Sequence, residues 1–114
     1  MHTLCRLDIK KGRDLYQAVI SFINEIKLQL PITDVYLYGS LINGELNEGS
    51  DIDLVIVGNF KESFFERIVQ VMRYTDLPIE PLVYTKEEFN EMKRSKNPFI
   101  REVLKRGKRI GVTS

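Results

Sequence analysis

The 114-residue chain has one cysteine, one histidine and no tryptophan. With Cys5 alone, no intramolecular disulfide can form, and Cys5 and His2 are too few for a zinc site built from Cys and His ligands. A bound metal would therefore need oxygen ligands, which favours Mg²⁺ or Mn²⁺. Both residues lie close to the N-terminus, where chains are commonly poorly ordered, so a Cys–His nucleophile pair is a weak interpretation.

The sequence also lacks a long apolar run. None approaches the roughly 20 residues that a membrane helix needs, and a charged fraction of 29% is typical of a soluble protein. The length suits one compact domain, so we expect a single domain over residues 1–114, with residues 1–10 loosely packed. No secretory apolar core is visible near the N-terminus, and a single cysteine fits a reducing compartment. We therefore expect a cytoplasmic protein without a membrane partner.

Basic side chains are the minority in residues 1–92 and acidic side chains are scarce in residues 93–114, so a formal net charge of only +1 hides an uneven distribution. Residues 1–92 carry 9 basic and 15 acidic side chains, whereas residues 93–114 carry 8 basic side chains and one acidic side chain, Glu102. A basic end on an acidic body predicts an acidic or polyanionic partner near the C-terminus. An ordinary solvated helix face with a basic tail explains the pattern equally well.

Apolar periodicity and turn residues predict an α/β (α+β) fold. Pro31 ends the first helix, Thr85 and Glu88 form a capping box, and Asn97-Pro98 is typical of a helix start. We expect a small mixed β-sheet with helices packed on one side. The expected order is helix 12–30, strand 34–38, helical turn 41–43, strand 52–57, helix 61–75, strand 79–84, a helix from about 86, helix 98–107 and a short strand 109–112.

The segment between residues 38 and 57 carries most of the chemical information. A Gly39-Ser40 pair follows an apolar run, and Asp51 and Asp53 open the next one. Because strand side chains alternate, both carboxylates would point to one face, where a divalent metal would offset their repulsion. Ser40 at a helix start would suit phosphate oxygens. Read more simply, Gly39-Ser40 is a capped turn, Asp51 an Asx turn and Asp53 an exposed residue.

The pattern of Gly39-Ser40, a ten-residue interval and Asp51-x-Asp53 resembles the signature of the DNA polymerase β-like nucleotidyltransferase superfamily, and most of all its short members, the minimal nucleotidyltransferases. The resemblance implies a palm-like catalytic core. It also implies that Gly39 and Ser40 bind the nucleotide, and that Asp51 and Asp53 hold two Mg²⁺ ions, with Mn²⁺ as a substitute.

The resemblance implies a third acidic residue, as metal ligand or general base, in the strand at 79–84. Glu80 occupies that position, where many relatives have Asp; Glu87 and Glu88 are fallbacks, although capping already explains Glu88. Pro81 predicts that this strand lies at an edge or is bulged, because proline cannot donate a ladder hydrogen bond. The chain also lacks the arginine that many relatives carry soon after Gly39-Ser40.

Three functions follow as hypotheses. The first is an enzyme that moves a nucleoside monophosphate, AMP from ATP or its equivalent from another nucleoside triphosphate, to a hydroxyl on a partner protein or RNA. By resemblance, such short chains act as the antitoxin of a toxin–antitoxin pair, with a small helical nuclease as toxin, and a chain this small is expected to associate with a partner or with itself. The second is a non-catalytic binding subunit that neutralises the nuclease by contact alone. The third and weakest is nucleic-acid binding through residues 93–109.

Overall fold

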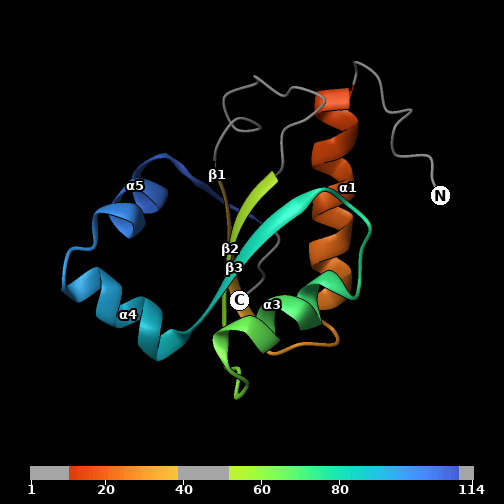
Figure 1. Cartoon of the computed structure of the whole chain (residues 1–114). Helices are drawn as coiled ribbons and strands as arrows, with labels where there is room; N and C mark the ends of the chain where they lie inside the picture. Colours follow the sequence, from red (N-terminus) through yellow and green to blue (C-terminus); the bar gives the residue numbers. More distant parts are fainter. Residues whose placement is uncertain (1–10, 39–51, 111–114) are drawn as a thin grey trace.

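The computed structural model describes residues 11–38 and 52–110. Over these ranges the chain forms four helices of at least nine residues and four strands (Figure 1). Their order is α1 (Lys11–Ile26), β1 (Ile32–Tyr38), β2 (Ile52–Gly58), α3 (Phe64–Met72), β3 (Ile79–Thr85), α4 (Lys86–Arg94), α5 (Pro98–Arg106) and β4 (Lys108–Arg109). The expected element order is confirmed there, while the expected helical turn at 41–43 lies outside the described residues.

The strands form one mixed sheet in the order β3-β2-β1-β4. Strands β1 and β2 pair antiparallel, β2 and β3 pair parallel, and β4 adds an antiparallel edge beside β1. The predicted edge position of the strand that carries Pro81 is therefore confirmed, because β3 has one neighbouring strand within residues 11–38 and 52–110. The predicted burial of the central strand on both faces is also confirmed, since six of the seven residues of β2, all except Asp53, are buried.

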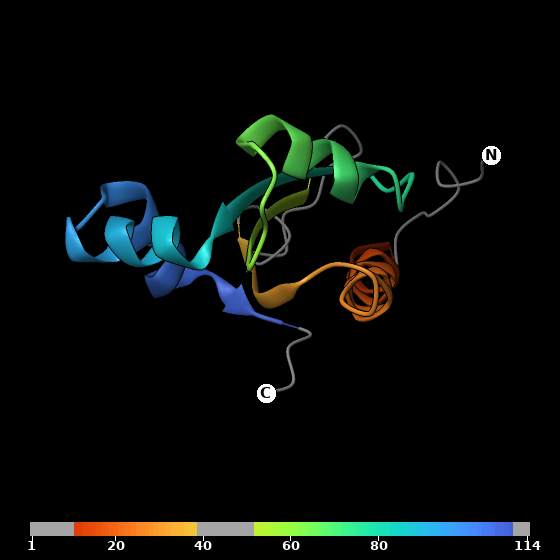
Figure 2. The ribbon, with the colours of Figure 1, turned by 90° about the horizontal axis from the view of Figure 1, so that it is seen from below.

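Two apolar clusters lie on opposite faces of the sheet. Helices α1 and α3 cover one face, where Val19, Ile23 and Val71 pack against Leu54 and other strand residues. Helices α4 and α5 meet the other face through Phe89, Ile100 and Val103, which pack against Val55 and Val57. Figure 2 shows α4 and α5 together on the side of the sheet away from α1. The mixed sheet of the α+β class is thus confirmed. The expectation that all helices pack on one side is wrong, because α1 and α3 cover one face and α4 and α5 the other.

Local capping fixes where the helices begin. Ser63 caps α3 and Thr85 caps α4, each in a reciprocal capping box with the glutamate three residues later. Asn97 accepts the N–H groups of Phe99 and Ile100 at the start of α5. The helix expected over residues 61–75 is α3, and it begins later than expected, at Phe64, because Ser63 caps it.

The buried residues of β1 show on which face of the sheet its other side chains lie. Val35 and Leu37 of β1 point into the cluster under α1, so Tyr36 and Tyr38 lie on the opposite face, with α4 and α5. Over residues 11–38 and 52–110, no helix is both long and apolar enough to cross a membrane.

Candidate active site

One row of side chains crosses three strands of the sheet. The register places Tyr38 of β1 opposite Asp53 of β2, and Asp53 beside Glu80 of β3. Neighbouring strands are about 4.8 Å apart, so the two carboxylates start from adjacent positions. The predicted cross-strand neighbourhood of Asp53 and Glu80 is therefore present in the sheet.

The three side chains of this row share one face. Leu54 and Ile56 of β2 point into the cluster under α1 and α3, whereas Val55 and Val57 point toward α4 and α5. By strand alternation Asp53 lies on the α4–α5 face, and the same alternation places Glu80 there with Tyr84. Asp53 is half-buried and Glu80 is exposed, so the row reaches from the interior to solvent.

The phenol of Tyr38 reports the negative charge of this row. Burial, then the nearby charges of Asp53, Tyr84 and Glu80, raise the pKa of Tyr38 to about 12. Burial and negative neighbours both disfavour a phenolate. Tyr38 therefore stays a neutral hydroxyl at physiological pH, beside the two acidic residues.

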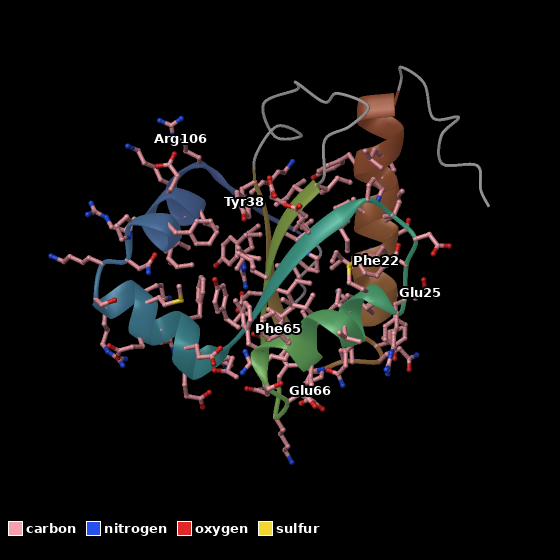
Figure 3. All side chains as sticks on the ribbon, viewed as in Figure 1. Phe22, Glu25, Tyr38, Phe65, Glu66 and Arg106 are labelled. Atoms are coloured by element: carbon pink, nitrogen blue, oxygen red, sulfur yellow. The ribbon has the colours of Figure 1, made fainter. Side chains whose placement is uncertain are left out.

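The row lies at the edge of the sheet where β1 ends and β2 and β3 begin. Figure 3 shows Tyr38 at the upper end of the strands in that view. In the sequence, Gly39 and Ser40 follow Tyr38 directly, and Asp51 precedes Ile52. Gly39, Ser40 and Asp51 themselves lie outside the described residues. Of the predicted site residues, the structure thus brings together Asp53 and Glu80.

Comparison with known proteins identifies the family. A sequence model of the family described as polymerase beta, nucleotidyltransferase, matches residues 21–114. The chain belongs to this nucleotidyltransferase family. The fold agrees with that of a protein from Sulfolobus solfataricus described as a nucleotidyltransferase: its crystal structure matches with a TM-score of 0.60 and 19% sequence identity, over 80% of this chain and 82% of that one. A search of curated protein sequences found no match.

Asp53 and Glu80, which we call the acidic row, have the ligand chemistry that suits a hard divalent cation. Carboxylate oxygens are the ligands that Mg²⁺ prefers, and Asp53 and Glu80 supply them from neighbouring strands of this nucleotidyltransferase. Among residues 11–38 and 52–110, no group of three or more His, Cys, Asp or Glu side chains could hold a metal ion. Two described carboxylates thus need at least one further ligand from a substrate, water or another part of the chain.

Glu88, the predicted fallback, is engaged elsewhere. Its carboxylate forms two hydrogen bonds with the buried guanidinium of Arg67, at 2.8 and 3.1 Å, and accepts the backbone N–H of Thr85. The hydrogen bonds from Arg67 are the main reason that the pKa of Glu88 lies below its usual value. Glu88 therefore links α4 to α3 in the nucleotidyltransferase fold.

Tyr38 is the site residue that sequence reasoning undervalued. From the sequence, Tyr36, Tyr38, Tyr74 and Tyr84 could stack a nucleotide base but are more simply core aromatics. Tyr36, Tyr38 and Tyr84 do pack against the cluster under α4 and α5, whereas Tyr74 is exposed. The ring of Tyr38 also meets Phe99 edge to face, with centroids 5.5 Å apart. Its position directly before Gly39 was the available signal, because the last residue of β1 stands at the same edge as the first residues of β2.

Proposed function

We propose that this nucleotidyltransferase moves AMP from ATP to a hydroxyl group on a partner protein or RNA and releases pyrophosphate. The pairing of Asp53 with Glu80 on one sheet face, at the edge that continues into Gly39, is the observation that supports it most. The acceptor oxygen would form a bond to the α-phosphorus as the bond between the α-phosphorus and the oxygen bridging to the β-phosphate breaks. That oxygen leaves with pyrophosphate. Other nucleoside triphosphates fit the same chemistry.

Each residue would have a separate task. Gly39 and Ser40 would bind the triphosphate, through a close backbone approach and a hydroxyl. Asp51, Asp53 and Glu80 would hold two Mg²⁺ ions, or Mn²⁺, which when bound neutralise phosphate charge and polarise the reacting phosphoryl group. A carboxylate of the row would also accept the proton of the attacking hydroxyl.

Tyr38 would donate a hydrogen bond beside this reaction. Its raised pKa keeps the phenol protonated, so it brings a donor and no charge to the acidic row. Edge-to-face packing of the Tyr38 ring against Phe99 would hold its hydroxyl in place beside the reacting groups.

The proposed biological role is that of an antitoxin whose partner is a small helical nuclease. The basic segment supports a partner surface at α4 and α5, because Lys96, Arg101 and Lys105 are exposed. An open hollow of about 550 Å³ lies over α5, lined by Pro98, Arg101, Glu102, Leu104 and Lys105. Cytoplasmic location and a single domain over residues 1–114 belong to the same proposal.

Labelled ATP tests the proposed transfer. The chain is incubated with labelled ATP, Mg²⁺ and its co-encoded neighbour, and label is sought on protein and RNA. We expect label that is lost in Asp53→Asn and strongly reduced in Glu80→Gln, because each variant removes one charged oxygen ligand. The matched control is Glu87→Gln: this exposed fallback carboxylate lies in the first turn of α4, beyond the end of β3 opposite to Glu80, and so is separated from the acidic row. Equal labelling by wild type and Asp53→Asn would contradict the assignment.

Ligand binding gives a readout that does not require turnover. Mg²⁺ and ATP together should raise the melting temperature of the wild-type chain and of Glu87→Gln, and leave that of Asp53→Asn unchanged. Absence of label, with a stable complex between the chain and its neighbour, would instead support the non-catalytic binding subunit. The missing arginine after Gly39-Ser40 and the glutamate at position 80 favour that alternative.

A further inference from the structure

Helix α3 has apolar side chains on its outer surface as well as its inner one. Inside, Arg67 and Val71 are buried. Outside, Phe65, Val69 and Met72 remain 77%, 48% and 38% exposed. Their spacing of four and three residues aligns them in one stripe, which we call the α3 stripe. A phenylalanine this exposed within an aligned apolar stripe indicates a surface that another molecule covers.

Charged residues border the α3 stripe on one flank. At 100° per residue, Glu66 and Arg73 lie on the same side of the stripe, near the two ends of α3. One carboxylate oxygen of Glu66 accepts the N–H of Ser63. Arg73 forms no salt bridge with the part of the chain that the structure describes. Figure 3 shows Phe65 and Glu66 together in the N-terminal half of α3.

This arrangement is self-complementary about a two-fold axis. When two copies of α3 pack antiparallel with Val69 at the axis, Glu66 lies about 4.5 Å before the centre and Arg73 about 6 Å after it, along the helix. The rotation keeps the charged flank on one side, so Glu66 of each copy meets Arg73 of the other. Phe65 of each copy then faces Met72 of the other.

We propose that the α3 stripe is the interface of a homodimer of this chain, with antiparallel α3 helices related by a two-fold axis. A second copy is the occupant because the stripe and its charges match their own rotated image, as an isologous interface requires. Two nine-residue helices make a small contact, so the dimer is weak and forms at micromolar or higher concentration.

The candidate active site stays open in this dimer. Helix α3 packs on the face of the sheet that carries Leu54 and Val71, whereas Asp53 and Glu80 lie on the face of α4 and α5. Pairing through the outer side of α3 therefore leaves both acidic rows accessible to substrate. The inference is independent of the proposed function, because it needs no catalysis.

Sedimentation velocity over a concentration series tests the dimer. Wild type should shift from monomer to dimer as concentration rises, and Phe65→Ser should weaken association by at least about tenfold, as loss of a central aromatic contact does. The matched controls are Leu28→Ser and Leu104→Ser, which remove exposed leucines, 79% and 42% exposed, that lie outside α3. A wild-type monomer up to millimolar concentration would overturn the proposal, as would equal effects of Phe65→Ser and the controls.

Charge exchange tests the antiparallel register. Glu66→Arg places two arginines together in each homodimer contact, and Arg73→Glu places two glutamates together, so each variant alone should be monomeric. An equimolar mixture should form a heterodimer, because every contact then joins opposite charges. Since Glu66 also belongs to the Ser63 capping box, folding of Glu66→Arg is checked by circular dichroism. If it does not fold, the double variant Phe65→Ser/Arg73→Glu replaces it, and association as strong as wild type would overturn the proposal.

A mixture that stays monomeric while both variants are folded would reject the register. A chain that remains monomeric alone but binds its co-encoded neighbour through Phe65 would also reject the homodimer, and would assign the α3 stripe to that other protein.

Discussion

Tyr38 shows how one residue reports on the candidate site. Its hydroxyl takes no charge at neutral pH, yet its pKa responds to the charges of Asp53 and Glu80. The sheet register explains this response, because Asp53 is the partner of both Tyr38 and Glu80. A spectroscopic property of one phenol can therefore measure the charge of the acidic row without any substrate.

At this scale we expect Asp53→Asn to lower the pKa of Tyr38 from about 12 toward the ordinary value of 10.0, because a negative neighbour that opposes the phenolate is removed. The pKa is measured by phenolate absorbance, with Tyr38→Phe subtracted to isolate this tyrosine. The control is Asp34→Asn, since Asp34 raises the pKa of Tyr36 and is not among the charges acting on Tyr38. An unchanged Tyr38 pKa in Asp53→Asn would show that the two groups are not neighbours.

Helix α3 is joined to β3 and α4 by one buried guanidinium. Arg67 donates to the backbone oxygens of Glu62 and Val83 and forms a bidentate pair with Glu88. Three segments outside α3 thus converge on a side chain whose charge is taken out of water and must be compensated. Because the capping box of α4 uses the same Glu88 carboxylate, the start of α4 and the position of α3 are linked.

We expect Glu88→Gln to lower the free energy of unfolding by about 1–2 kcal/mol at pH 7, the value of a hydrogen bond to a charged group reduced for partial exposure. The lowered pKa of Glu88 means that its contribution is complete above its ordinary pKa of 4.5 and is lost as the pH falls through the folded-state pKa. Urea unfolding at pH 7 and at pH 3 measures this. The variant should differ from wild type less at pH 3, and Glu87→Gln should match wild type at both; an equal difference at both pH values would contradict the linkage.

The whole molecule has two apolar clusters of unequal size. The cluster under α1 and α3 includes residues of β1, β2 and β3, whereas the cluster under α4 and α5 is smaller and reaches the sheet mainly through Val55 and Val57. Fewer buried apolar contacts favour local opening at lower free energy. Helices α4 and α5 are therefore the part of the fold best able to adjust when a substrate or partner approaches the acidic row.

Native-state hydrogen exchange should resolve this difference. We expect amides of β1 and β2 to exchange slowest and those of α4 and α5 to exchange faster under conditions where the chain remains folded. Ile100→Ala, which empties a fully buried position, should cost about 2–5 kcal/mol and speed exchange in α4 and α5 more than in α1. Ile23→Ala, at an equally buried position under α1, is the matched variant. Equal protection of all helices would contradict independent opening.

Local signals in the sequence determined the order of the elements and several helix starts, although α1 ends at Ile26, before the expected stop at Pro31. Ser63, Thr85 and Asn97 fix helix starts through hydrogen bonds within a few residues. Pro81 correctly predicted an edge strand, because a missing donor is a local property. The Asp51-x-Asp53 spacing after Gly39-Ser40 was sufficient to indicate the nucleotidyltransferase family, which the family comparison confirms.

The tertiary structure alone decided which distant residues meet. Parallel pairing of β2 with β3 made Glu80 the neighbour of Asp53, and antiparallel pairing with β1 added Tyr38; no local pattern fixes a register between segments so far apart. Tertiary packing likewise buried Arg67 of α3, where it pairs with Glu88, and left Phe65 of the same helix on the surface. Helical spacing alone does not tell which of these two residues is buried. The sequence by itself thus determined which elements form, because interactions between near neighbours decide that. Contacts between distant segments determined the row of acidic groups, because these contacts depend on how the whole sheet assembles.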